Sequence, residues 1–129
     1  ASTHRILVVD DNDDARLLLA DVLAELGHEV TTAASGPAAL AAIPASAPEI
    51  AILDIGLPEM DGYQLAVELR RALPDIRLIA LSGYGQPNDR ARSQSAGFDR
   101  HLVKPVEMRR LLQTIAEVAR ERTDREPQS

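Results

Sequence analysis

Ile50-Ala51-Ile52-Leu53-Asp54 is a short apolar stretch that ends in a carboxylate. Its length suits a strand, and its unbroken apolar character is typical of a strand buried on both faces. Leu78-Ile79-Ala80-Leu81 repeats the pattern and is followed by Ser82. Strands of this kind are the inner strands of a parallel sheet with helices on both faces, so the two segments predict an α/β fold.

Apolar runs of strand length alternate with segments of helical spacing along the whole chain. The predicted strands are Ile6–Val9, Glu29–Ala33, Ile50–Leu53, Ile76–Leu81 and His101–Val103. The predicted helices lie near residues 15–26, 36–43, 63–73, 88–96 and 108–120. Because parallel strands need crossover connections and those crossovers are helices, the order predicts an open parallel sheet.

Local signals indicate where the helices begin and end. Gly27 and Pro74 are expected to end the first and third helices, and Asp61 to cap the third. Ser35 is the expected cap of the second helix and Pro44 its end. The first helix has an apolar stripe that is predicted to face the core, formed by Ala15, Leu18, Leu19, Val22, Leu23 and Leu26. The fourth helix offers only Ala91 and Ala96 to a core, so we expect it to lie at the low-stability end of the domain and to move easily.

Length and composition narrow the class of protein. The 129 residues suit one domain, expected over residues 1–121, with a disordered tail or linker over 122–129. A net charge of -6 and 2% aromatic residues argue against binding to nucleic acid or anionic lipid. The absence of cysteine excludes disulfides and thiolate metal sites. No apolar run approaches the roughly 20 residues of a membrane span, so we expect a cytoplasmic protein without membrane contact.

Polar side chains follow most of the predicted strands at their carboxyl ends, where the ligand site of an open parallel sheet lies. Asp10-Asp11 follows the first strand, Asp54 the third, Ser82 the fourth and Lys104 the fifth. Three neighbouring carboxylates repel one another unless a cation neutralises them, and oxygen ligands with room for water favour Mg²⁺. A carboxylate beside such a metal can attack phosphorus, and Asp54 is placed to do so. Lys104, the only lysine, can pair with a phosphoryl oxygen.

Simpler interpretations apply to several of these residue types. A single acidic residue after a strand is more often a turn former or helix cap, and we prefer that interpretation for Asp13, Asp14 and Asp61. His4, His28 and His101 are scattered and lack the spacing of metal ligands, so we expect them at surface or edge positions. The joint placement of the acidic residues and Lys104 on strand ends is what favours a functional site.

Four motifs together resemble the receiver domains of bacterial two-component response regulators, over residues 5 to about 121. The motifs are Ile6-Leu7-Val8-Val9-Asp10-Asp11-Asn12, Leu53-Asp54-Ile55-Gly56-Leu57-Pro58-Glu59-Met60-Asp61-Gly62, Ala80-Leu81-Ser82-Gly83 and Leu102-Val103-Lys104-Pro105. The resemblance implies a single doubly wound (βα)5 domain with the flavodoxin-like strand order 2-1-3-4-5 and helices on both faces.

The resemblance also implies the chemistry of the acidic residues. Asp54 would be the phosphoacceptor. Asp11 and Asp54 would bind Mg²⁺, or Mn²⁺ as an alternative, together with the backbone carbonyl of Gly56. Asp10 would assist mostly through water. Gly56 and Tyr84 would flank the approach of water to the phosphoryl group and so tune its lifetime.

The remaining motif residues would bind the phosphoryl group and respond to it. By resemblance, Ser82 and Lys104 would each contact a phosphoryl oxygen, and the Lys104–Pro105 peptide bond would be cis. The switch would consist of Ser82 and His101, at a position where the family usually has Tyr or Phe. Imidazole is smaller and can be charged near neutral pH, so coupling to the output can differ here.

The resemblance implies a phosphorelay in which a histidine kinase or a histidine phosphotransfer protein donates the phosphoryl group. The domain would catalyse the transfer and its own dephosphorylation without being a separate enzyme, and would act as a monomer or weak dimer without direct nucleic-acid contact. Phosphorylation would switch the face formed by the fourth helix, fifth strand and fifth helix. Gly83-Tyr84-Gly85-Gln86, His101 and Val106 resemble receivers at the carboxyl end of hybrid histidine kinases, with a stand-alone regulator as the alternative.

Two other functions compete with this interpretation. A protein-interaction module with the receiver fold can signal without phosphate, but such domains usually lack an acidic residue or the lysine. A phosphatase of the haloacid dehalogenase type also uses an aspartyl nucleophile and Mg²⁺. It would need a second Asp two residues beyond the nucleophile, where this chain has Gly56.

Overall fold

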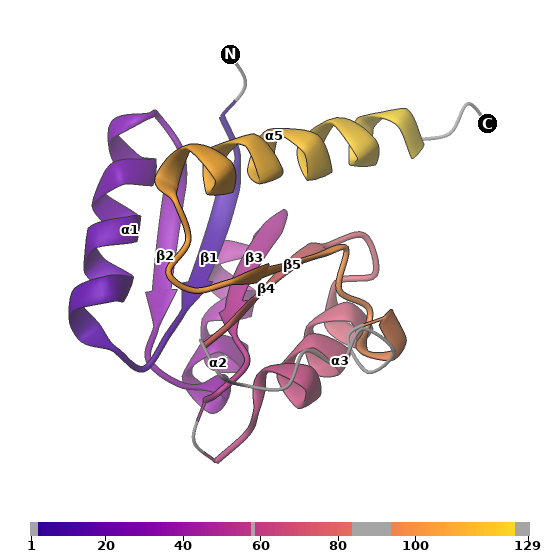
Figure 1. Cartoon of the computed structure of the whole chain (residues 1–129). Coiled ribbons are helices and arrows are strands. Elements are labelled where there is room, and N and C mark those ends of the chain that lie inside the picture. Colours follow the sequence, from indigo (N-terminus) through magenta and orange to yellow (C-terminus); the bar gives the residue numbers. More distant parts are fainter. Residues whose placement is uncertain (1–2, 58, 84–93, 126–129) are drawn as a thin grey trace.

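The protein is a five-stranded parallel sheet with helices on both faces, as seen in a computed structural model that describes residues 3–57, 59–83 and 94–125 (Figure 1). Its elements, in chain order, are β1 (Arg5–Val9), α1 (Asp13–Glu25), β2 (Glu29–Ala33), α2 (Gly36–Ser46), β3 (Ile50–Asp54), α3 (Gly62–Ala72), β4 (Arg77–Ser82), β5 (Arg100–Val103) and α5 (Met108–Arg125). The strand order is β2-β1-β3-β4-β5. The predicted fold class and strand order are confirmed.

The sheet separates two apolar layers. Helices α1 and α5 cover one face and α2 and α3 the other (Figure 1). Successive residues of a strand point to opposite faces, so Ile50 and Ile52 of β3 pack with α1 and α5, whereas Ala51 and Leu53 pack with α2 and α3. All four are almost completely buried, as expected for an inner parallel strand.

Most of the expected helix ends are confirmed. Asp61 caps α3 in a reciprocal capping box with Gln64, and the helix ends at Ala72, just before Pro74. Ser35 caps α2 through the backbone N–H of Ala38. Helix α1 ends at Glu25, and the following Gly27 adopts a positive φ of 97°.

The prediction that Pro44 ends α2 is wrong. The helix continues through Pro44 to Ser46 and ends at Ala47, which is left-handed with a φ of 41°. Proline lacks the N–H that would bond to the carbonyl four residues earlier, and its ring crowds that carbonyl. The residues after Pro44 stay joined to the helix because Ala47 N–H donates to Ile43 O and Ser46 Oγ donates to Ala42 O. A proline one turn before the helix end is therefore tolerated.

The buried stripe of α1 is narrower than predicted. Leu19 and Leu23 are buried, whereas Leu18 and Leu26 are 64% and 52% exposed. Leu18 lies about 100° around the helix from Leu19, and Leu26 follows the last helical residue. Only the part of the helix surface that contacts the rest of the domain is buried, and this part is narrower than the predicted apolar stripe.

The carboxyl-terminal part of the chain differs from expectation in length. Helix α5 continues to Arg125, beyond the expected end near Arg120, since the sequence has no glycine or proline between Met108 and Pro127. The predicted fourth helix lies mostly outside the described residues, as do Ala91 and Tyr84, although residues 94–96 are helical and Ala96 is buried. No described helix is long and apolar enough to span a membrane.

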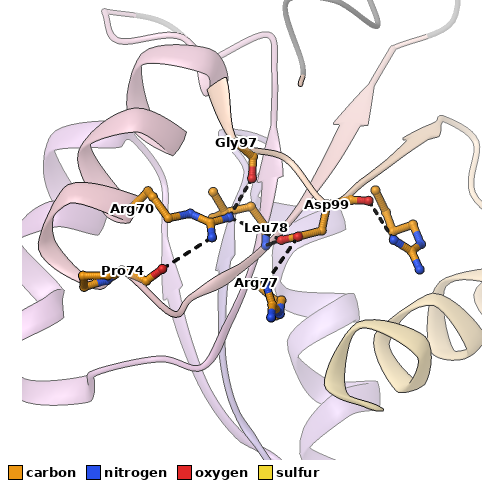
Figure 2. A network of polar contacts seen from close by, with 7 residues as sticks. Arg70, Pro74, Arg77, Leu78, Gly97 and Asp99 are labelled. Atoms are coloured by element: carbon orange, nitrogen blue, oxygen red, sulfur yellow. Dashed lines mark hydrogen bonds and ion pairs between the residues drawn. The ribbon is translucent and has the colours of Figure 1, made fainter. Parts of the chain in front are cut away.

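A polar network joins the amino ends of β4 and β5 to α3 (Figure 2). Asp99 accepts the backbone N–H of Leu78 at 2.8 Å and pairs with the guanidinium groups of Arg70 and Arg77, each at 3.4 Å. Arg70 also donates to the carbonyl of Gly97 at 2.6 Å. Because the Arg77 side chain is almost fully buried, the network satisfies a charge that would otherwise be costly to bury. It joins the inner strand β4 and the edge strand β5 to α3 at their amino ends.

Candidate functional site

Three carboxylates gather at the carboxyl ends of β1 and β3. Asp10 and Asp11 follow β1, and Asp54 is the last residue of β3. The two strands are neighbours in parallel register, which brings their ends together. Oxygen atoms of the three side chains all lie within 4.8 Å of one another. The expectation that these residues meet is therefore confirmed.

The cluster carries more negative charge than its surroundings balance. Asp10 and Asp54 are buried, while Asp11 is exposed to solvent. Burial raises the pKa of Asp10, and the charges of Asp54 and Asp11 raise it further. The backbone N–H of Asn12 and the Lys104 ammonium oppose this rise only in part. Closely spaced carboxylate oxygens, one of them open to solvent, fit a hard divalent cation such as Mg²⁺ that keeps part of its water.

Lys104 reaches the cluster from the end of the outer strand β5. Its ammonium nitrogen lies 3.3 Å from Asp54 Oδ2 and 3.6 Å from Asp10 Oδ2. The lysine backbone N–H donates to Ser82 O at 2.7 Å, and the Lys104–Pro105 peptide bond is cis, as the resemblance implied. A positive charge is thus held beside both buried carboxylates.

The loop after Asp54 is closely packed against the start of α3. The backbone N–H of Gly56 donates to Asp54 Oδ1 at 3.0 Å, which orients the carboxylate. A Cβ at Gly62 would lie 2.8 Å from the carbonyl oxygen of Asp54 and 2.7 Å from Ile55 Cα. Gly62 is therefore required for this approach. Sequence reasoning did not identify it, because its position after the Asp61 cap looks like ordinary helix initiation.

Ser82 and His101 lie on neighbouring strands beside the cluster. Ser82, the last residue of β4, is buried, and its hydroxyl lies 3.0 Å from Nε2 of His101 on β5. The sequence predicted a switch role for both, which stays a prediction. It also predicted a surface or edge position for the histidine, and this position is confirmed because β5 is the edge strand. Their direct hydrogen bond was not predicted.

The turn between β1 and α1 is held by several hydrogen bonds. Asn12 donates its backbone N–H to Asp10 Oδ1 at 2.9 Å, and its own side chain caps α1 by accepting from Ala15. Asp13 lies in the first helical turn and pairs with Arg16 at 2.7 Å. Arg16 also donates to the carbonyl of Asp10 at 2.9 Å. Sequence reasoning missed Arg16, since nothing in the motif distinguishes it from a surface arginine.

The two remaining histidines lie away from this site. His4 and His28 precede β1 and β2 at the amino ends of the strands, where their rings stack with centroids 5.7 Å apart. They are partly buried, in agreement with the expectation of surface or edge positions.

Comparison with known proteins identifies the family and supports the fold. A family model described as the response regulator receiver domain matches residues 6–116. The chain belongs to this family. It is similar to a receiver domain protein of Methanospirillum hungatei described as CheY-like, with a TM-score of 0.88 and 33% identity over 95% of this chain and 98% of that one. The chain is thus a receiver domain of the two-component type.

Relatives of this receiver domain include longer proteins of two kinds. A probable transcriptional regulator, ycf27, of Cyanophora paradoxa is 38% identical over 83% of this chain and 44% of the relative. The sensor histidine kinase RcsC of Salmonella typhi is 36% identical over 86% of this chain and 12% of the kinase. The chain therefore spans less than half of either relative.

Proposed function

We propose that this receiver domain accepts a phosphoryl group on Asp54 from a phosphohistidine donor in a Mg²⁺-dependent reaction. The observation that carries the proposal is the position of the Lys104 ammonium, 3.3 Å from Asp54 Oδ2, beside three carboxylates that lie within 4.8 Å of one another. This arrangement supports the proposal because it would supply a nucleophile, a cation for the phosphoryl oxygens and an anionic metal site at one edge of the sheet.

The chemical step follows from these groups. A carboxylate oxygen of Asp54 forms a bond to phosphorus while the phosphorus–nitrogen bond of the donor breaks, and the departing imidazole takes up a proton. The Gly56 N–H orients Asp54 for attack, and Lys104 neutralises charge on one phosphoryl oxygen. Asp11, Asp54 and the carbonyl of Gly56 would hold Mg²⁺, with Asp10 acting through water. The metal would supply charge neutralisation at the phosphoryl oxygens.

The same geometry supports a switch toward β5. A phosphoryl group adds about −1.5 to −2 charge and three acceptor oxygens. Ser82 would donate to one of these oxygens, which changes its bond to His101 on β5. The proposed output is a change in the face formed by the fourth helix, β5 and α5, where a partner would bind.

The proposed partners are a histidine kinase or a histidine phosphotransfer protein. The similarity to RcsC, a sensor histidine kinase, supports an origin as the receiver of a hybrid kinase, in which the parent chain would be the enzyme. The similarity to probable transcriptional regulators supports a separate regulator. Either arrangement implies a cytoplasmic location, since the donor would draw its phosphate from ATP.

Intact mass after incubation with acetyl phosphate and Mg²⁺ tests the proposal. We expect one phosphate adduct on the wild-type chain, none on Asp54→Ala, and an unchanged adduct on the control Asp75→Ala, which removes an exposed aspartate. Chelation of the metal should abolish the adduct. If the wild-type chain forms no adduct with acetyl phosphate or with a phosphorylated kinase, the proposal is wrong and the phosphate-independent interaction module is favoured.

A further inference from the structure

Arg16 turns back from α1 toward the metal-binding edge of the sheet. Its guanidinium donates through Nη1 to the carbonyl oxygen of Asp10 at 2.9 Å and pairs through Nη2 with Asp13 Oδ1 at 2.7 Å. Only 12% of the Arg16 side chain is exposed. The guanidinium therefore spans the turn that carries Asp10 and Asp11.

This position is not explained by the helix itself. A cation near the amino terminus of a helix is opposed by the helix dipole, so Arg16 must be held by its contacts. The chain offers a direct comparison in Arg71, which makes a pair of the same i,i+3 spacing with Glu68. That pair is longer, at 3.5 Å, and the Arg71 side chain is 73% exposed. An ion pair at this spacing alone thus leaves an arginine in solvent, and the bond to the Asp10 carbonyl sets Arg16 apart.

The three clustered carboxylates differ in what orients them. The backbone N–H of Asn12 fixes Asp10, and the backbone N–H of Gly56 fixes Asp54. Within residues 3–57, 59–83 and 94–120, no hydrogen bond or ion pair reaches the Asp11 carboxylate. The direction of that side chain therefore depends on the backbone of Asp11, which begins at the peptide unit whose carbonyl Arg16 binds.

We propose that Arg16 is a positioning residue for binding of the divalent cation. Arg16 holds the Asp10–Asp11 peptide unit so that the Asp11 side chain faces the metal. The inference rests on the proposed function for the identity of the ion, Mg²⁺. Residues that orient metal ligands commonly change metal affinity by about 10-fold to 100-fold when they are substituted. Arginine suits this position because its planar fork can reach a carbonyl and a carboxylate at the same time.

Charge and positioning predict opposite results when Arg16 is replaced. Removal of a nearby positive charge alone would strengthen Mg²⁺ binding, because it removes repulsion between two cations. Loss of the contacts that Arg16 makes with the Asp10 carbonyl and Asp13 would weaken Mg²⁺ binding, since the Asp11 side chain would sample other directions. Arg16→Lys keeps the charge but lacks the planar fork. An effect of charge alone therefore predicts no change in Mg²⁺ affinity for this variant, whereas the positioning role predicts weaker binding.

The experiment is a titration of the full chain with Mg²⁺ at constant ionic strength. Backbone amide chemical shifts near Asp11 and Asp54 report the binding at each step. We expect Arg16→Met and Arg16→Lys to weaken Mg²⁺ binding about 10-fold. Arg71→Met, which removes an exposed arginine of the same pair spacing, should bind Mg²⁺ like the wild-type chain. Urea unfolding without Mg²⁺ and the amide spectrum outside the turn check that each variant is folded.

The results separate the two ideas. A wild-type chain that binds no Mg²⁺ contradicts the proposed metal-dependent function itself. A wild-type chain that binds Mg²⁺, with equal or tighter binding by both Arg16 variants, overturns the positioning role and leaves the proposed function intact. Arg16→Lys keeps the charge and an apolar stem, so it provides this answer even if Arg16→Met is unstable.

Discussion

The hydroxyl of Ser82 lies 3.0 Å from Nε2 of His101, so the residue proposed to bind a phosphoryl oxygen is already bonded to the edge strand. A serine hydroxyl has a single proton to donate. Once that proton is given to a phosphoryl oxygen, the hydroxyl can only accept a bond from the imidazole. The proposed phosphorylation of Asp54 would therefore either set the direction of the bond to His101 or break it.

Replacement of His101 by leucine should speed phosphorylation of Asp54 by acetyl phosphate. If the hydroxyl donates to His101 in the unphosphorylated domain, its release removes a competing bond worth about 1 kcal/mol, or roughly fivefold in rate. The effect should vanish in a Ser82→Ala background, because the two residues act through one bond. Phosphorylation rates of the four chains in this cycle provide the measurement.

A glutamine at position 101 is the control for this cycle. Its amide can approach the position of Nε2, so His101→Gln should phosphorylate at a rate close to the wild-type rate. If His101→Leu changes the rate equally with and without the Ser82 hydroxyl, the histidine acts through packing of β5 and the competition is refuted.

Asp10→Asn should stabilise the metal-free domain at neutral pH by about 0.5–2 kcal/mol. Burial first, and then the charges of Asp54 and Asp11, raise the pKa of Asp10 above its usual 3.8, so the ionised form is disfavoured in the folded state. Asparagine removes the charge and can still accept the Asn12 N–H through its Oδ1. Urea unfolding in the presence of a metal chelator measures the difference.

The pH dependence of that difference follows from the raised pKa. Between pH 3.8 and the folded pKa the folded state binds more protons, so the free energy of unfolding falls as pH rises through this window. The cost is fully present only above the folded pKa and disappears well below 3.8. The advantage of Asp10→Asn should therefore shrink as the pH is lowered toward 4. A variant less stable than the wild-type chain at neutral pH would contradict this account.

The sequence predicted the acidic site because each member stands at the carboxyl end of a strand, where parallel topology alone brings them together. The convergence of Asp10, Asp54 and Lys104 could be predicted without any knowledge of side-chain contacts. The role of Arg16 could not be predicted in this way, because its contact reaches back over a turn to a carbonyl group. Every residue has a backbone carbonyl, so a contact to one cannot be recognised from the residue types in the motif.

The errors in the helices have a similar origin. The apolar stripe of α1 predicted which side of the helix faces the sheet, but it did not predict that Leu18 within the stripe is exposed. Pro44 is a helix breaker by propensity, yet later bonds from Ser46 and Ala47 keep α2 continuous. Periodicity describes one helix at a time, and the extent of its tertiary contacts is outside that information.

Gly62→Ala should destabilise the domain by about 1–3 kcal/mol through overpacking. The new Cβ would lie 2.8 Å or less from backbone atoms of Asp54 and Ile55, which cannot move without shifting the proposed phosphoacceptor. Gly36→Ala is the matched control, since Gly36 is likewise the first residue of its helix, but the three atoms nearest to its added Cβ belong to the side chain of Met60, at 2.9–3.2 Å, and none is a backbone atom. Thermal unfolding of both variants tests this, and an equal loss in the two would contradict the backbone collision.

Asp99→Ala should be the most destabilising of these substitutions, with a loss of about 3–5 kcal/mol. It removes the shared acceptor of Arg70, Arg77 and the Leu78 N–H, and leaves the buried Arg77 charge without this counterion (Figure 2). Glu68→Ala is the control, because it breaks an exposed pair with Arg71 and should cost less than about 1 kcal/mol. Urea unfolding should show this large difference. A loss for Asp99→Ala as small as that for Glu68→Ala would mean that water replaces the carboxylate, and that the network does not hold β4 and β5 in place.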